Sequence, residues 1–256
     1  DSVASRGLGD VYKRQEADNL PPLLDEVCRA LDGAGIEFEM LVVNDGSSDH
    51  SLQVLTEYAA RDERLRVYHH QHSAGQSTSI WQAAWQARGA WLATLDGDGQ
   101  NDPADLPAMF ERAQKGDITL LAGYRHKRND SEIKRLSSRI ANAVRSRLLK
   151  DDTPDTGCGI KIFEREAFLR LPYFNHMHRF LPALIRAQGG TTLSWPVNHR
   201  ARQAGSSNYG TLDRLMAGLL DLGGVMWLAH RSRLPAPLDL RSGKDVDKDL
   251  HARQEP

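Results

Sequence analysis

Two stretches decide the fold: Glu39-Met-Leu-Val-Val-Asn-Asp-Gly-Ser-Ser-Asp49 and Trp91-Leu-Ala-Thr-Leu-Asp-Gly-Asp-Gly-Gln-Asn-Asp102. Each begins with a short apolar run that predicts a buried strand and ends in an acidic loop. In an open parallel sheet, ligands bind beyond the carboxyl ends of the strands. The two loops are therefore expected at the same edge of one sheet, where their carboxylates are available to a ligand.

Strand-like and helix-like segments alternate around these stretches. Leu20, Leu23, Leu24 and Val27 fall on one stripe at helical spacing, and Asp102 before Pro103 is a typical helix start. This alternation predicts βαβ units in an α/β domain, with a mostly parallel central sheet and helices on both faces. Strands are expected at 39–43, 65–69, 91–95, 118–122, 160–163 and 191–197, and helices at 19–31, 51–60, 76–88, 103–114 and 212–229.

The composition excludes several classes of protein. Of the 256 residues 40% are hydrophobic, and 33 Lys and Arg against 34 Asp and Glu leave a formal net charge of -1, which argues against a nucleic-acid partner. The two cysteines, Cys28 and Cys158, are in no CxxC pair, which excludes a thiolate zinc site and indicates a reducing compartment. No run reaches the roughly 18 apolar residues of a membrane span. We expect a cytoplasmic protein.

The second acidic loop suits a divalent cation. Asp96 and Asp98 form an Asp-x-Asp pair directly after a strand, and one or two carboxylates suffice for Mg²⁺ or Mn²⁺ when substrate phosphates complete the coordination. An EF-hand is excluded, because Asn101 replaces its Gly and Pro107 its final Glu. Since Asp, Asn, Ser and Gly also dominate ordinary turns, a plain turn is the alternative for either loop alone.

Six short motifs in order resemble the glycosyltransferase family 2 enzymes of GT-A fold, and among them the branch similar to dolichol-phosphate mannosyltransferase. The resemblance extends from Glu16 to about Trp227. The motifs are Glu16-Ala-Asp-Asn-Leu20, Val43-Asn-Asp-Gly-Ser-Ser-Asp49, Asp96-Gly-Asp-Gly-Gln100, Gly123-Tyr-Arg125, Asp155-Thr-Gly-Cys-Gly-Ile-Lys161 and Asn198-His-Arg-Ala-Arg-Gln-Ala-Gly-Ser-Ser-Asn-Tyr209, the last with Asn208 in place of the family's Lys.

This resemblance implies a site for a nucleotide sugar, linked to GDP or UDP. Asp45 would accept hydrogen bonds from the base, Arg202 with Ser206 would close over phosphate, and the metal would be Mg²⁺ or Mn²⁺. The donor-binding residues implied are Asp45, Gly46, Ser47, Gly75, Asp96, Arg125, Lys134, Arg135 and Ser206; the metal ligands are Asp96, Asp98 and Gln100; the catalytic residues are Asp96, Asp98, Asp155 and Arg202. The basic stretch 125–150 has a solvated helix face as its alternative.

The resemblance also implies an inverting transfer in one displacement. The leading acceptor is a polyprenyl phosphate or a related envelope acceptor, whose anionic oxygen needs no strong base. A saccharide hydroxyl is the alternative acceptor and would require a base, for which Asp155 is the candidate; whether Asp155 is a base or orients the acceptor stays open. A sugar-nucleotide-binding module without catalysis is the third alternative.

The chain is expected to divide into four parts. Residues 1–15 resemble a non-native leader in place of the family's first hydrophobic strand, so a central strand would be missing. Residues 16–211 form the catalytic domain. Residues 212–233 are an apolar helix that either packs in the core or lies in the headgroup region of the inner face of the cell membrane, as a peripheral contact. Residues 234–256 are expected to be a disordered tail.

Overall fold

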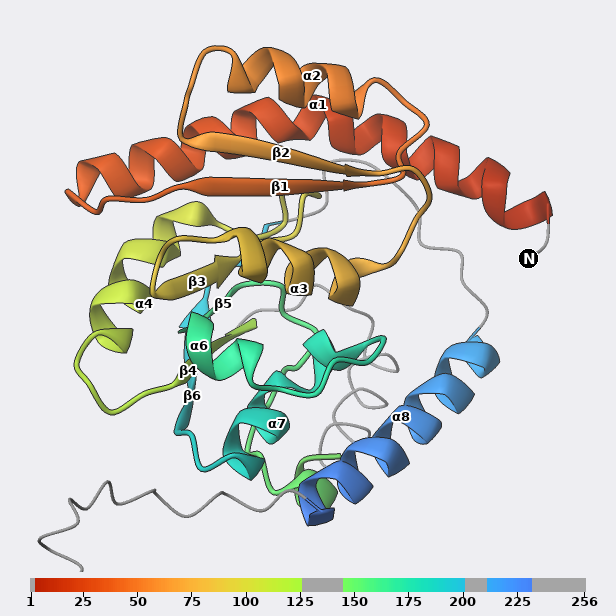
Figure 1. Ribbon diagram of the computed structural model, residues 1–256, viewed down its shortest axis with the longest axis vertical. Coiled ribbons are helices and arrows are strands. Elements are labelled where there is room, and N and C mark those ends of the chain that lie inside the picture. The colour runs from red at the N-terminus through yellow and green to blue at the C-terminus, as the bar shows by residue number, and fades with distance from the viewer. Residues whose placement is uncertain (1–2, 126–144, 201–210, 232–256) are drawn as a thin grey trace, which may run out of the picture.

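The computed structural model describes the chain at residues 3–125, 145–200 and 211–231, and the side chains at 17–125, 145–200 and 218–231 (Figure 1). Helices and strands alternate through the first half of the chain, as the sequence predicts. The helices are α1 (Val3–Gly33), α2 (Ser51–Ala59), α3 (Gln76–Gln86), α4 (Leu106–Ala113), α6 (Arg165–Leu169), α7 (Leu181–Ala187) and α8 (Thr211–Arg231), with 3-10 turns η1 (Pro103–Asp105) and η2 (Met177–Arg179). The strands are β1 (Met40–Asp45), β2 (Leu65–His70), β3 (Trp91–Thr94), β4 (Leu120–Arg125), β5 (Lys161–Glu164) and β6 (Thr192–Val197).

The strands form two sheets. One is the parallel pair β1–β2, and the other has the order β3-β5-β4-β6. Within the second sheet β4 and β6 are parallel, whereas β5 runs antiparallel to both of its neighbours. The α/β class is confirmed, but the expected mostly parallel single sheet is corrected to these two sheets. Strand periodicity carries no information on direction or order, which are decided by how the connections cross the sheet.

Both faces of the four-stranded sheet are buried, because successive side chains of a strand point to opposite sides. Leu121 of β4 belongs to one apolar cluster, while its neighbours Leu120 and Ala122 belong to the other. The first cluster also contains residues of α1, α4 and the β1–β2 pair, and the second contains residues of α6, α7 and α8. In Figure 1 the β1–β2 pair lies beside α1 and α2, and α7 and α8 lie at the opposite end of the molecule.

Helix α1 is continuous from Val3 to Gly33, through the boundary expected at residue 15 and through Pro21 and Pro22. Among the described strands, β1 pairs only with β2, and β3 pairs only with β5. The leader and the missing central strand therefore stay predictions. No helix within the described residues is long and apolar enough to span a membrane.

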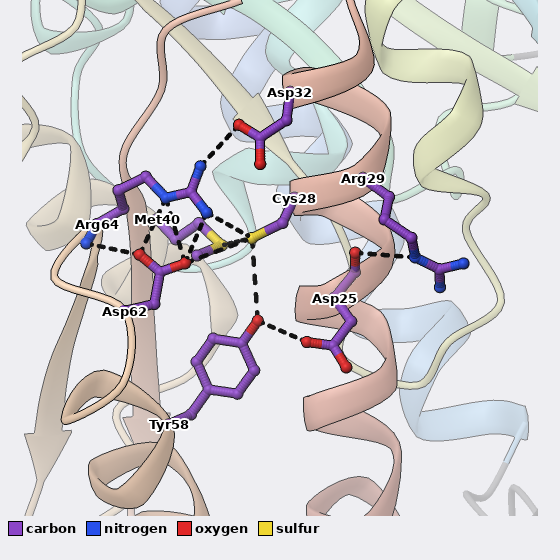
Figure 2. A network of polar contacts seen from close by, with 8 residues as sticks. All are labelled: Asp25, Cys28, Arg29, Asp32, Met40, Tyr58, Asp62 and Arg64. Atoms are coloured by element: carbon purple, nitrogen blue, oxygen red, sulfur yellow. Dashed lines mark hydrogen bonds and ion pairs between the residues drawn. The ribbon is translucent and has the colours of Figure 1, made fainter.

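A polar network attaches α1 to the turn that precedes β2 (Figure 2). Arg64 donates to Asp62 and, through Nη1 at 2.7 Å, to Asp32 of α1. The hydroxyl of Tyr58 donates to Asp25 of α1 at 2.8 Å. The hydrogen bonds from Arg64 lower the pKa of Asp62 to about 2. The network holds α1 beside the β1–β2 pair, whose carboxyl ends carry the first acidic loop.

Candidate functional site

The two acidic loops meet at the first residues of α3. Asp45, the last residue of β1, accepts a hydrogen bond from the backbone N–H of Gly75 at 2.9 Å. Asp96, two residues beyond β3, accepts one from Nε2 of Gln76 at 2.9 Å. Because Gly75 and Gln76 are consecutive, carboxylates from the two sheets lie at one edge of the molecule. The two loops lie close together, as expected, but they follow strands of two different sheets and not of one sheet.

Both oxygens of the Asp45 carboxylate accept hydrogen bonds within the protein. Oδ1 accepts from Ala74 N–H at 2.7 Å, and Oδ2 accepts from the Ser73 hydroxyl at 2.7 Å and from Gly75 N–H. His70, the register partner of Asp45 on β2, places Nδ1 2.7 Å from Oδ1. Burial raises the pKa of the Asp45 carboxyl, but the bonds together outweigh it and leave the pKa below its usual value. Binding of a base by Asp45 stays a prediction, and it requires one of these bonds to open.

Three further residues of the predicted donor site act here through their backbone. Gly46 has φ +68°, and a Cβ there would lie 2.6 Å from the backbone nitrogen of Ser73, so the Asp45 loop touches the segment after β2 at a position that excludes any side chain. Gly75 has φ +90°, a conformation in which its N–H reaches Asp45. Ser47 donates its N–H to Oδ1 of Asn44 at 3.1 Å.

The loop after β3 is held by hydrogen bonds between its own backbone and side chains. The N–H of Asp96 donates to Oδ1 of Asn101 at 2.9 Å, and the N–H of Gln100 donates to Oδ1 of Asp98 at 3.1 Å. Burial raises the pKa of Asp96, and the negative charge of Asp98 raises it further, while Lys161 opposes the shift. Two carboxylates close enough to repel each other suit a site where a divalent cation relieves that repulsion.

Lys161 is a site residue to which the sequence motif assigned no role. The residue is buried, and Nζ donates to the carbonyl oxygen of Cys158. Burial lowers the pKa of Lys161, and the charges of Asp96 and Asp155 act against that shift. The signal in the sequence is a lysine between Ile160 and Ile162, in a run that is otherwise apolar. A buried lysine thus lies near both Asp96 and Asp155.

Arg125 and Asp155 form a bidentate ion pair. Nε of Arg125 lies 2.6 Å from Oδ2 of Asp155, and Nη2 lies 2.9 Å from Oδ1. Asp155 is buried, whereas the arginine side chain is partly exposed. The guanidinium expected to bind phosphate is therefore also the partner of the proposed base, a pairing that favours the orienting alternative for Asp155.

Arg200 is a second residue without an assigned role. Its N–H donates to the Gln100 carbonyl at 3.0 Å, and its guanidinium contacts Asp102 at 2.8 Å and Glu26 of α1 at 2.5 Å. Arg200 thereby connects α1 to the Asp96–Asp102 loop. The predicted site residues Lys134, Arg135, Arg202 and Ser206 lie outside the described residues.

The described part of the chain contains no group of three or more His, Cys, Asp or Glu side chains placed to hold a metal ion. The loop itself contributes the carboxylates of Asp96 and Asp98, with Gln100 beside them. A cation bound by this set would need oxygens from another source, as expected where substrate phosphates complete the coordination.

The family model "Glycosyl transferase family 2" matches residues 11–171 of this chain. The chain belongs to that family. The matched range includes both acidic loops, Arg125 and Asp155, so every predicted site residue of this family 2 chain lies within it except Arg202 and Ser206.

Two curated relatives share close to a third of their residues with the chain. The dodecaprenyl-phosphate galacturonate synthase of Rhizobium johnstonii is 31% identical over 86% of this chain and 66% of its own length. The undecaprenyl-phosphate 4-deoxy-4-formamido-L-arabinose transferase of Edwardsiella ictaluri is 30% identical over 79% of this chain and 62% of its own length. The chain thus spans somewhat less than two thirds of the length of these relatives.

Solved structures confirm the GT-A fold. The mannosyl-3-phosphoglycerate synthase of Rubrobacter xylanophilus superposes with a TM-score of 0.65 at 14% identity, over 88% of this chain and 75% of that one. The glucosyl-3-phosphoglycerate synthase of Mycobacterium tuberculosis, in complex with Mn²⁺, UDP-glucose and glycerol 3-phosphate, gives 0.58 at 17% identity, over 86% and 78%. At these identities the likeness establishes the fold.

Proposed function

We propose that this family 2 protein transfers a sugar, with inversion, from a nucleoside-diphosphate sugar to a polyprenyl phosphate. The observation that carries the proposal is the meeting of Asp45 and Asp96 at the adjacent residues Gly75 and Gln76. The curated relatives named for polyprenyl-phosphate acceptors support the choice of acceptor.

The donor diphosphate is assigned to the Asp96–Gln100 loop. Asp96, Asp98 and Gln100 would hold Mg²⁺ or Mn²⁺, which would neutralise negative charge on the leaving diphosphate. The Mn²⁺ and UDP-glucose in the Mycobacterium tuberculosis structure support a divalent cation here. Lys134, Arg135, Arg202 and Ser206 are proposed to contact phosphate oxygens, since such donors bind anionic oxygens strongly. The choice between UDP and GDP stays open.

In the proposed reaction a phosphate oxygen of the acceptor attacks the anomeric carbon as the bond to the nucleoside diphosphate breaks. That oxygen is already anionic near neutral pH, so no general base is required. The bidentate pairing of Asp155 with Arg125 supports an orienting role, because it fixes the position of a guanidinium whose side chain is partly exposed.

Helix α8 is proposed to contact the membrane that holds such an acceptor. Leu219, Leu220, Met226 and Trp227 are exposed on one face, with Leu220 74% and Trp227 61% accessible. The exposed positions recur at i, i+1, i+4, i+7 and i+8, which is one stripe of a helix, while Val225 on the opposite side is buried. His230 and Arg231 end the helix with basic groups suited to anionic headgroups.

The test is sugar transfer into lipid. The protein is incubated with Mn²⁺, undecaprenyl phosphate in detergent and a panel of labelled UDP- and GDP-sugars, and label is counted in the organic extract. We expect transfer from one donor class, abolished in Asp98→Ala and retained in the matched surface variant Asp117→Ala. Nucleotide binding without lipid labelling would overturn the acceptor, and the absence of Mn²⁺-dependent nucleotide binding would overturn the donor site.

A further inference from the structure

The first turn of α3 contacts two different parts of the molecule. Gly75 and Gln76 bind the acidic loops, as described above. The next two residues, Ser77 and Thr78, bind residues 173–178, which we call the bridging segment. Four consecutive residues thus connect the proposed donor site to a segment that lies about 100 positions later in the chain.

Ser77 makes two contacts with His178 of the bridging segment. The Ser77 hydroxyl accepts from the backbone N–H of His178 at 3.2 Å, and its oxygen lies 2.7 Å from Nδ1 of the same residue. Burial and nearby positive charges lower the pKa of His178 to about 3, so the ring that contacts Ser77 is neutral. Ser77 is only 1% exposed, so this contact is shielded from water.

The second contact joins Thr78 to Tyr173, and the direction of its hydrogen bond is defined. The Thr78 hydroxyl donates its single proton to the Ala74 carbonyl at 2.6 Å, so the Tyr173 hydroxyl, 2.8 Å away, is the donor to Thr78. Between these contacts, Oδ1 of Asn175 lies beside Gly75 at ordinary van der Waals distance from where a Cβ would be. The bridging segment therefore packs along the whole first turn of α3.

Among the described side chains, a polar contact and apolar packing both attach helix α8 to the bridging segment. Nδ1 of His176 lies 2.9 Å from Oδ2 of Asp221, on the inner side of α8. His176 has φ +66°, a left-handed conformation that is uncommon for a residue with a side chain. Two apolar residues of α8 close to Asp221 also contact this region. Leu222, the next residue, and Val225, about one turn further along α8, pack into the same apolar cluster as Met177.

We infer that Asp221 and His176 are positioning residues that couple the position of α8 to the donor site. The inference rests on the proposed function, since it takes α8 as the membrane contact and the acidic loops as the donor site. A membrane that holds α8 in its docked position also holds the bridging segment, and with it Gln76 against Asp96. Nucleotide binding and membrane binding then favour each other by the same factor, because such linkage is reciprocal.

The experiment measures nucleotide affinity with and without vesicles. The probe is UDP or GDP with Mn²⁺, whichever stabilises the protein more against heat, and the vesicles are phosphatidylethanolamine and phosphatidylglycerol without polyprenyl phosphate. For the unaltered chain we expect vesicles to lower the nucleotide Kd by about fivefold, the low end of typical coupling. In Asp221→Asn we expect vesicle binding to persist while the effect on Kd falls below about twofold.

Two further variants make the result specific. His176→Asn removes the imidazole from the same contact but keeps a residue type that tolerates a left-handed backbone, and it should behave as Asp221→Asn does. Glu166→Gln removes an exposed pair with Arg170 whose side chains take no part in these contacts, and it should keep the full vesicle effect. A vesicle effect that survives in Asp221→Asn and His176→Asn would overturn the inference, as would an unaltered chain that binds vesicles with no change in Kd. Failure of the proposed function is distinguishable, because it removes nucleotide binding or lipid labelling from every variant.

Discussion

Gly159 lies against the carboxylate of Asp96, on a side where a Cβ atom would overlap Oδ2 and Cγ. The same Cβ would lie 2.8 Å from Oδ1 of Asn101, the atom that accepts the Asp96 N–H. Gly159 does not have a positive φ, so the missing side chain, and not an unusual backbone, is what this position requires. The segment before β5 thus limits where the Asp96 carboxylate can point.

Gly159→Ala is expected to displace Asp96 and to weaken Mn²⁺-dependent nucleotide binding by at least about tenfold, with an overpacking cost of about 1–3 kcal/mol in stability. Gly218→Ala is the matched control: nothing lies within 4 Å of its Cβ, and alanine in α8 should stabilise the helix by up to about 1 kcal/mol. Thermal shifts with and without Mn²⁺ and nucleotide measure both effects. A Gly159→Ala variant that binds nucleotide as tightly as the unaltered chain would show that nucleotide binding does not depend on the present position of Asp96.

His70 is expected to make the Asp45 loop sensitive to pH. The hydrogen bond to Asp45, and then that to Gln82, raise the pKa of His70 above its usual value. A raised folded-state pKa means that this stabilisation is fully present below about pH 6.5 and is lost as the pH rises through the folded-state pKa. In the unaltered chain the free energy of unfolding should therefore decrease as the pH rises from about 6.5 through the folded-state pKa of His70.

Chemical denaturation at a series of pH values checks this, together with an NMR titration of the His70 ring. His70→Gln should flatten the decline, while His69→Gln, at an exposed neighbour, should keep it. An NMR pKa of His70 at or below that of a free imidazole would contradict the prediction.

Asp155→Asn is expected to lower turnover without removing a limb of the pH–rate profile, because an orienting residue does not exchange a proton with substrate. Asp155→Ala leaves the Arg125 guanidinium without its bidentate partner and should cost about 3 kcal/mol in stability. Stopped assays from pH 5 to 9 and urea denaturation provide the two measurements. Loss of the acidic limb in Asp155→Asn would identify Asp155 as a base instead.

Arg200→Met is expected to weaken Mn²⁺-dependent nucleotide binding severalfold while changing stability by less than about 1 kcal/mol, since a partly exposed ion pair contributes little to folding. Arg200→Lys should restore little, because an ammonium group cannot contact Glu26 and Asp102 as the planar guanidinium does. Arg112→Met, which removes a surface pair with Asp117, is the control. Equal nucleotide affinities in the Arg200 and Arg112 variants would contradict a positioning role.

The positions of the elements could be predicted because local patterns encode them. All six expected strands are present, and three of the four expected helices from Ser51 onward begin within one residue of their predicted starts. The fourth, expected from residue 103, begins as the 3-10 turn η1 and continues as α4 from Leu106, while α8 extends the last expected helix by a residue or two at each end. The separation of β1–β2 from the other strands and the reversed direction of β5 could not be predicted, because strand order depends on contacts between residues far apart in the chain.

The candidate site divides in the same way. Asp45, Asp96 and Asp98 could be recognised because acidic residues directly after buried strands stand out in the sequence. His70, Lys161 and Arg200 could not, since their roles come from partners 25, 65 and 98 positions away. The pairing of Arg125 with Asp155 likewise required the folded chain.

The amino-acid sequence by itself determined the α/β class, the family and the two acidic loops, because each depends on residue types within a few positions of one another. Only the tertiary structure decided that Asp45 and Asp96 both bind the first residues of α3, that a buried lysine lies near Asp96, and that His176 connects α8 to the segment that contacts the same turn. The physical reason is that hydrogen bonds and buried charges act over a few ångströms of space, and the folded chain alone brings those groups within that distance.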